Sequence, residues 1–435
     1  MESFEPAVRA TVSRLFGCPG DALRFEMLAA HASSRTYWRV HLRSPEVPPE
    51  VSPEASRAAR ADSDSAARAD SNSAARADKI HGVEPRTLAL MVLHREDRGI
   101  KSDEIVEIES TITELPFVNV HRFLRSFTDA VPEIYFLDEA NGLIYLEDLG
   151  DTLFESVVAD ASDDARRAWY GRALDLLVTL QTEGTRRLDE RCIASKASFT
   201  ETLFLWEFEH FIAYGLGTKF GRDVDPGLLA LLREAFAPVA RRLCSEPRVF
   251  THRDFQSRNL LVQPEVPPEV SRAARADSDG AARVDSDNAA RADSDGEARA
   301  DKIRCTRLRL IDFQDALLGP RTYDLVALLR DSYVELPPAL VETLVDDYLA
   351  RAAAGGFHAG RDAFREAFAR MTLQRKLKDY GRFVYIDRVK GNPGFLRHNP
   401  VNARYILDAA EQLPELGAAR AILADALGPV AGRRA

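Results

Sequence analysis

The chain lacks the features that would place it in or on a membrane. No run of eighteen apolar residues occurs in its 435 residues, so no transmembrane helix is predicted. Residues 1–16 show an amphipathic helical pattern with acids and arginines between the apolar positions, not the apolar core of a signal peptide. We therefore expect a cytoplasmic protein with no membrane partner. The sequence specifies no oligomeric state.

Paired cysteines and clustered positive charge are missing as well. The four cysteines are far apart and form no Cys-x-x-Cys pair, which argues against a zinc motif and against a disulfide framework. The formal net charge is -10, whereas non-specific binding of nucleic acid needs an excess of Lys and Arg to displace counterions from phosphates. We expect reduced thiols and no nucleic-acid partner.

What the chain does contain is a repeated low-complexity segment. Residues 45–80 and 264–303 are near copies, and both are built on an eight-residue unit, AARADSDx. Large apolar residues do not recur in this unit, so burial cannot offset the entropy cost of ordering it. Each copy lies between two strand-like stretches and is predicted to be a flexible insert at a hairpin tip. These stretches are 36–42 and 87–93 for the first copy, and 259–262 and 306–311 for the second.

Two motifs carry the chemistry. Residues 251–262 read THRDFQSRNLLV, in which an H-R-D tripeptide ends at Asp254 and Asn259 follows five residues later. This is the H-R-D-x-x-x-x-N pattern of phosphoryl-transfer enzymes. Asp312 follows in LIDFQ. Without the second insert the two motifs are about thirteen residues apart, the separation of a short hairpin that ends in a metal-binding Asp.

The residue types suit phosphoryl transfer. A carboxylate must lie beside the acceptor hydroxyl and take its proton, and Asp254 is assigned that catalytic role. Asn259 and Asp312 supply oxygen ligands for Mg²⁺ bound to ATP, because hard cations prefer oxygen. His252 is expected to be structural and to hold a backbone carbonyl. Asp324 is expected to accept hydrogen bonds from the catalytic loop.

The remaining motifs of protein kinases are missing. The chain has no G-x-G-x-x-G-x-V, no V-A-I-K and no A-P-E sequence. Instead, Ser33 and Ser34 lie in a Ser-rich turn, ASSRTYWR, that is expected to cover the ATP phosphates. The segment after Asp312 leaves no room for an activation loop. The acceptor is therefore expected to be a small molecule.

These motifs resemble the aminoglycoside phosphotransferase superfamily, and within it the bacterial anomeric kinases of N-acetylmuramate and N-acetylglucosamine. The stretches that carry the resemblance are SRTYWR, YLEDLGD, DFQDALLGPRTYDLVALLRD and QRKLKDYGRF. It implies an α+β, bilobal protein-kinase-like fold with ATP in the cleft. The small antiparallel-sheet N-lobe would span residues 1–147, and the larger, mostly helical C-lobe residues 148–435. The implied activity is ATP-dependent formation of a sugar 1-phosphate in peptidoglycan recycling.

The resemblance also implies nucleotide contacts outside the motifs. Residues 147–149 would form the hinge whose backbone binds adenine, with Glu147 and Leu149 at its ends. Met91 stands where most relatives have a phosphate-binding lysine. The ATP phosphates would then be held by Mg²⁺ together with Arg35 or Arg39.

The acceptor is the least determined part of the prediction. Glu207 is a candidate for binding sugar hydroxyls, with a solvated helix acid as the alternative. Asp315 is a candidate for orienting the acceptor, with support of the loop as the alternative. Other acceptors of the superfamily, namely an aminoglycoside, choline or homoserine, are rivals to an amino sugar. A catalytically silent nucleotide-binding protein is a further alternative, suggested by Met91 and disfavoured by the complete set of motif residues.

Overall fold

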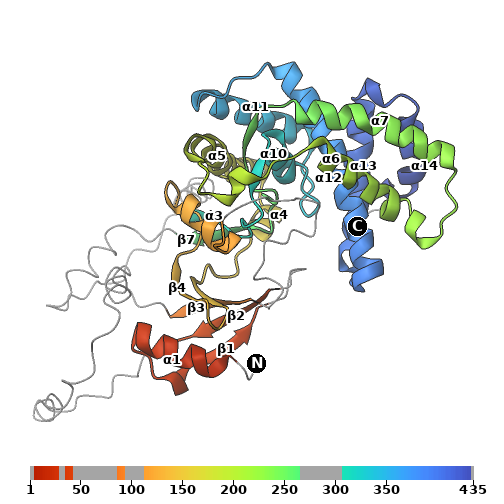
Figure 1. Cartoon of the computed structure of the whole chain (residues 1–435). Helices are drawn as coiled ribbons and strands as arrows, with labels where there is room; N and C mark the ends of the chain where they lie inside the picture. Colours follow the sequence, from red (N-terminus) through yellow and green to blue (C-terminus); the bar gives the residue numbers. More distant parts are fainter. Residues whose placement is uncertain (1–3, 29–34, 43–85, 94–111, 265–305, 433–435) are drawn as a thin grey trace, which may run out of the picture. The chain divides into compact units, whose positions relative to one another are not determined.

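The computed structural model describes residues 4–28, 35–42, 86–93, 112–264 and 306–432. They form two compact units. The smaller unit contains residues 4–28, 35–42, 86–93 and 132–149, and the larger contains the rest. The smaller is a sheet with one helix and the larger is mostly helical (Figure 1), so the α+β class is as predicted. The predicted lobe boundary after residue 147 stays a prediction; residues 112–131 belong to the larger unit.

The smaller unit is built on a five-stranded antiparallel sheet in the order β1-β2-β3-β5-β4. Its strands are β1 (Arg24–Met27), β2 (Thr36–His41), β3 (Thr87–Val92), β4 (Ile134–Asp138) and β5 (Leu143–Glu147), and its helix is α1 (Glu5–Phe16).

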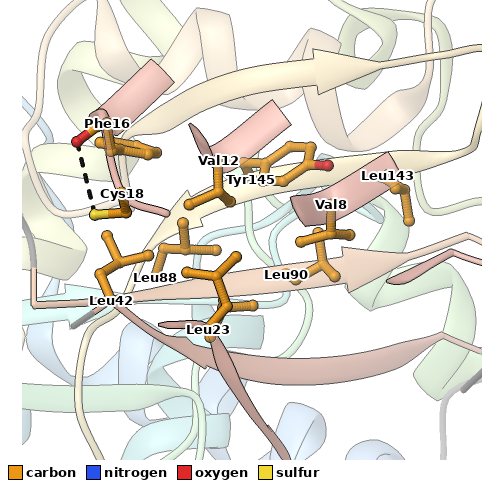
Figure 2. Packing of buried hydrophobic residues seen from close by; sticks show 11 residues of the cluster. Val8, Val12, Phe16, Cys18, Leu23, Leu42, Leu88, Leu90, Leu143 and Tyr145 are labelled. Carbon is orange, nitrogen blue, oxygen red and sulfur yellow. Dashed lines mark hydrogen bonds between the residues drawn. The ribbon is translucent and has the colours of Figure 1, made fainter. Parts of the chain in front are cut away.

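Helix α1 covers one face of this sheet. Val8, Val12 and Phe16 recur every four residues and therefore form one apolar stripe. The stripe is buried against alternate residues of the strands, as Figure 2 shows. The helix ends at Gly17, whose φ of 66° lies in the left-handed region that glycine adopts without strain. The strand residues in this core include Leu88 and Leu90 of β3 and Leu143 and Tyr145 of β5.

The opposite face of the sheet carries two residues of the predicted nucleotide site. Successive side chains of a strand point to opposite faces. Met91 therefore faces away from α1, because its neighbour Leu90 packs in the α1 core. Arg39 does the same, because its neighbour Val40 is in that core. Met91 is fully buried and pairs with Ile144 of β5, so an apolar core residue occupies the position of the lysine.

The larger unit holds ten helices and two short strand pairs among its described residues. Strands β6 (Arg248–Thr251) and β9 (Leu317–Pro320) form one pair, and β7 (Leu260–Pro264) and β8 (Thr306–Leu310) form the other. Helix α10 is buried along its whole length and packs against α12. The helices are α3 (Pro116–Arg125), α4 (Phe154–Ala159), α5 (Asp163–Arg187), α6 (Glu201–His210), α7 (Pro226–Cys244), α10 (Thr322–Leu329), α11 (Pro338–Ala354), α12 (Arg361–Lys390), α13 (Asn399–Glu411) and α14 (Ala419–Ala431).

The strands that flank both inserts pair as predicted. His41 of β2 pairs with Thr87 of β3, and Pro264 of β7 pairs with Thr306 of β8. Both strand pairs are antiparallel, so the described residues on either side of each undescribed segment are neighbours in a sheet. The inserts themselves lie outside the described residues, apart from Pro264.

Two helices of the larger unit end in distinct ways. Helix α12 ends at Lys390 and is capped by Gly391, which has a φ of 70°. Helix α6 ends at His210 and is followed by a π-helical turn, Phe211–Gly215. None of the described helices has the length and apolar character needed to cross a bilayer. The three described cysteines are free thiols.

The paired positions on either side of the inserts lead to a prediction. We expect that Asn-Gly can replace residues 43–85, and also residues 265–305, because a two-residue turn closes an antiparallel hairpin whose ends already pair. The shortened chain should keep its melting temperature within a few degrees and keep its kcat. Circular dichroism and a coupled kinase assay would measure both. Loss of folding on removal of either insert would show that the insert contributes to the structure.

Candidate active site

The catalytic loop, residues 252–259, connects strands β6 and β7 in the larger unit. Strand β6 pairs with β9, and β7 pairs with β8, so the loop leaves one strand pair and enters the other. Asp312 follows β8, and the N–H of Ile311 donates to the carbonyl of Asn259 at 3.1 Å. The second motif therefore begins directly beside the end of the first, as the hairpin predicted.

Asp324 holds the start of the loop. Its two carboxylate oxygens accept the backbone N–H groups of His252 at 2.7 Å and Arg253 at 2.9 Å. The prediction that Asp324 binds the catalytic loop is confirmed. Arg253 has a φ of 78°, in a region that side chains other than glycine adopt at a cost of about 1–3 kcal/mol. The hydrogen bonds to Asp324 offset this cost and hold the backbone in the conformation that leads into Asp254.

The His252 ring joins the two motifs. Its Nδ1 accepts the backbone N–H of Asp254 at 3.2 Å, and its Nε2 lies 3.1 Å from the carbonyl of Ile311. One imidazole therefore ties the backbone at Asp254 to the peptide bond that precedes Asp312. Burial lowers the pKa of His252 to about 4, so the ring is neutral and bonds as one donor and one acceptor. The structural role predicted for His252 is confirmed.

Asp254 is an accessible carboxylate among buried cations. Its side chain is 46% exposed, and its Oδ1 accepts a hydrogen bond from Arg375 at 3.1 Å. Desolvation raises the pKa of Asp254, but the charges of Arg375 and Lys378 outweigh it and lower the pKa to about 2. Arg375 also donates to the carbonyl of Arg253 at 2.7 Å. Arg375 therefore holds the carbonyl of the strained residue, whose N–H is held by Asp324.

Asn259 and Asp312 fit the predicted magnesium site by donor type. The Nδ2 of Asn259 donates to the carbonyl of Asp254 at 2.9 Å, which leaves its Oδ1 as the atom that can bind a cation. Asp312 is exposed, with a φ of 65°. Among the described residues, no group of three or more His, Cys, Asp or Glu forms a metal cage. A cation here would therefore share its coordination with phosphate oxygens, as Mg²⁺ commonly does.

Asp315 is linked to Asp312 through Gln314. The Nε2 of buried Gln314 donates to Asp312 at 2.8 Å and to Asp315 at 3.0 Å. Asp315 is itself exposed. The bonds of Gln314 are consistent with the alternative that Asp315 supports the loop. The contact of Asp315 with an acceptor stays a prediction.

Glu207 is not a solvated helix acid, which was one of the two alternatives for it. Its side chain is fully buried, accepts a hydrogen bond from Gln374, and lies 3.7 Å from the amine of Lys378. Burial raises its pKa, and the charge of Lys378 opposes this. The Lys378 amine also donates to the hydroxyl of Tyr323 at 3.4 Å. Binding of sugar hydroxyls by Glu207 stays a prediction.

The interaction of Arg375 and Lys378 with Asp254 was not predicted from the sequence. Both lie in QRKLKDYGRF, a stretch that contributed only to the family resemblance. The spacing of residues along α12 could have indicated that both side chains are directed toward the protein interior. Arg375 and Lys378 continue the alternating four- and three-residue spacing of the buried residues Phe364, Phe368 and Met371. Charges on a stripe that is otherwise apolar indicate buried ion pairs.

In the smaller unit, Arg39 forms a two-pronged ion pair with Asp148. The nitrogen–oxygen distances are 2.7 and 3.1 Å, and neither side chain is more than 10% exposed. Asp148 lies between Glu147 and Leu149, so Arg39 anchors the predicted hinge. Arg35 is partly buried. The predicted phosphate contacts of both arginines and the adenine contacts of the hinge stay predictions, and Ser33 and Ser34 lie outside the described residues.

Comparison with known proteins identifies the family. Residues 104–270 and 306–366, more than half of the chain, match the phosphotransferase enzyme family. The chain belongs to this family. It is therefore an enzyme of the kinase type, as the resemblance predicted.

Similar proteins point in the same direction. The N-acetylmuramate/N-acetylglucosamine kinase of Pseudomonas putida is 28% identical over 313 residues, which cover 71% of this phosphotransferase and 77% of that protein. The protein of the same name from Neisseria meningitidis is 25% identical over 318 residues, covering 72% and 80%. A choline kinase from Cryptosporidium parvum has a TM-score of 0.51 at 10% identity, covering 96% of this chain and 99% of that one. The last likeness confirms the kinase-like fold alone.

The contact of Arg375 with Asp254 predicts a pH effect. In its predicted role Asp254 must be ionised to accept a proton, and Arg375 lowers the pKa of Asp254. The substitution Arg375→Gln should raise the pKa of Asp254. As the pH is lowered, kcat/KM of the variant should therefore begin to fall at a pH about one unit or more above that at which the wild type begins to fall. The milder Arg375→Lys should shift the profile less.

A matched control lies on the same helix. Arg370 is also buried, but it pairs with Glu366 and Glu415 rather than with the catalytic loop. Arg370→Gln should leave the acid side of the pH profile in place. An unshifted profile in an active, folded Arg375→Gln variant would contradict the role given to Arg375.

Proposed function

We propose that this phosphotransferase transfers the γ-phosphoryl group of ATP to the anomeric hydroxyl of N-acetylmuramate or N-acetylglucosamine. The acceptor oxygen bonds to the γ-phosphorus, the bond between that phosphorus and the β–γ bridging oxygen breaks, and the hydroxyl proton passes to the carboxylate of Asp254. The products are ADP and a sugar 1-phosphate. Support for this acceptor comes from the names of the relatives, which align over about 70% of the chain. Such a reaction belongs to peptidoglycan recycling in the cytoplasm.

One observation carries the proposal: the His252 ring bonds to the backbone at Asp254 and also to the backbone that precedes Asp312. A base for the acceptor and a ligand for the nucleotide's cation must lie close together for in-line transfer. By bonding to both backbone segments, the His252 ring keeps the segment of Asp254 close to the segment of Asp312.

The low pKa of Asp254 favours an acidic hydroxyl. A carboxylate with a pKa of about 2 is a weak base. It orients the hydroxyl and takes the proton as the new bond forms, rather than generating a free alkoxide beforehand. An anomeric hydroxyl is more acidic than an ordinary alcohol because the ring oxygen withdraws electron density. The site is therefore better matched to a sugar anomer than to the primary alcohol of choline.

Magnesium and the nucleotide complete the proposal. Mg²⁺ would neutralise phosphate charge, and the Oδ1 of Asn259 with the carboxylate of Asp312 would hold it. We assign the nucleotide to the N-lobe, residues 1–147, and the catalytic groups to the C-lobe, residues 148–435. Adenine would bind the backbone from Glu147 to Leu149. Since Met91 stands where most relatives have a lysine, Arg35, together with Ser33 and Ser34, would contribute to phosphate binding.

The buried cations favour an acceptor that carries a carboxylate. Lys378 is 14% exposed, and its charge acts on Asp254. N-acetylmuramate carries a lactyl carboxylate, which the Lys378 ammonium would attract. Choline and aminoglycosides carry positive charge, which Lys378 would repel. Glu207, beside Lys378, and Asp315 are the proposed partners for sugar hydroxyls.

A screen of acceptors tests the proposal. The purified chain with Mg²⁺ and ATP should phosphorylate N-acetylmuramate and N-acetylglucosamine, but not choline, homoserine or kanamycin. Proton-coupled phosphorus NMR should show the phosphate coupled to the anomeric hydrogen. Asp254→Asn should lower kcat by at least about a hundredfold, because a positioned acid or base contributes typically 10²–10⁴-fold.

Binding of nucleotide provides the control. Asp254→Asn should bind ATP as the wild type does, since its effect is on the chemical step. Transfer to a cationic alcohol in preference to the sugars would refute the proposed acceptor. ATP binding without transfer to any acceptor would favour the catalytically silent alternative.

A further inference from the structure

A cavity of about 310 Å³ lies in the larger unit at a distance from the catalytic loop. It is lined by residues that follow α7, by Arg321, and by one side of α12. The paired strands β6 and β9 separate the cavity from the catalytic loop. The catalytic loop follows Thr251, at one end of this strand pair. Glu246 and Arg321 lie beyond the other end of the pair, where Arg248 pairs with Pro320. Four paired residues span about 10 Å, so this cavity is distinct from the catalytic site.

Arg321 gives the cavity a positive charge that no acidic side chain in the described residues neutralises through an ion pair. It is 8% exposed, lies with its guanidinium carbon 5.3 Å from the centre of the Phe364 ring, and reaches only the carbonyl of His358 at 3.5 Å. The other two arginines of the cavity, Arg242 and Arg370, both contact Glu415. The charge of Arg321 acts on Glu246 in the same cavity without forming an ion pair with it, so the guanidinium retains donors that an anionic ligand can use.

Glu246 adds an acceptor that lacks a partner. Its Oε2 accepts the hydroxyl of Thr322 at 2.8 Å, while its Oε1 is buried without a hydrogen bond among the described residues. Burial raises its pKa to about 7, so its repulsion of an anion at neutral pH is reduced. Thr322 begins α10, the helix that carries Asp324. Glu246 therefore links the wall of the cavity, through Thr322, to the helix that holds the catalytic loop.

We propose that this cavity binds the phosphate monoester of a small sugar. The Arg321 guanidinium binds the phosphate, the Ser245 hydroxyl in the cavity wall bonds to a sugar hydroxyl, and Ala363 and Phe364 pack against the sugar ring. The volume is at the lower end of the range of small-ligand sites, about 300–1,000 Å³, which suits a single sugar unit. Sugar phosphates are also the class of the proposed product, although the cavity is argued from its own residues.

Calorimetric titration of the full chain with glucose 6-phosphate tests this proposal, with glucose and inorganic phosphate as companion probes. Glucose 6-phosphate should bind saturably in the millimolar range or tighter, inorganic phosphate more weakly, and glucose not at all. Arg321→Gln should weaken glucose 6-phosphate binding about ten- to hundredfold, the value of one charge-assisted hydrogen bond. Absence of saturable binding of glucose 6-phosphate to the wild type would overturn the proposal.

Three further variants locate the binding. Ala363→Leu fills the cavity from an exposed position of α12, where leucine is a good helix former, so it should fold and still lose binding. Arg330→Gln removes an arginine that stacks on Tyr405 outside the cavity and should bind normally. Asp312→Asn, in the catalytic site, should also bind normally. Binding that survives Ala363→Leu but disappears in Asp312→Asn would assign the ligand to the catalytic site and refute the inference.

Discussion

The site depends on the clamp that Asp324 places on the catalytic loop. Two backbone N–H groups, those of His252 and Arg253, bond to this one buried carboxylate, and Arg375 holds the carbonyl of Arg253 from the other side. Together they maintain a backbone conformation that Arg253 would otherwise avoid. Asp254 is the next residue, so its position depends on that conformation. The geometry of the candidate site is therefore set by the backbone, with Asp324 bound to the N–H of the strained residue and Arg375 bound to its carbonyl.

The parts of this arrangement that were predictable from sequence are those encoded by local pattern. Alternating apolar residues at 36–42 and 306–311 predicted strands, and their positions around the two repeats predicted hairpins. Asp254, Asn259 and Asp312 were assigned because phosphoryl transfer requires those residue types at that spacing; the structure brings their two motifs together, and their roles stay predictions. Asp324 was assigned correctly as a support for the loop. Each of these inferences involves residues close in the sequence once the insert is set aside.

The parts that were not predictable arise from contacts between distant segments. Whether Glu207 meets water depends on how α6 packs against α12, and the sequence around it fits a solvated or a buried acid equally well. Arg375 lies more than a hundred residues from Asp254, and only the fold brings them to 3.1 Å. Arg39 was expected at the phosphates, but its pairing with Asp148 joins β2 to the segment after β5. Charge partners of this kind follow from tertiary packing, which composition does not reveal.

We propose that Asn259 and Asp312 hold one cation beside Asp254. Anomalous diffraction from crystals grown with Mn²⁺ and a non-hydrolysable ATP analogue would locate that cation. We expect a manganese peak within bonding distance of both Oδ1 of Asn259 and a carboxylate oxygen of Asp312. A manganese ion bound to the analogue with neither residue in its coordination shell would show that these residues do not form the metal site.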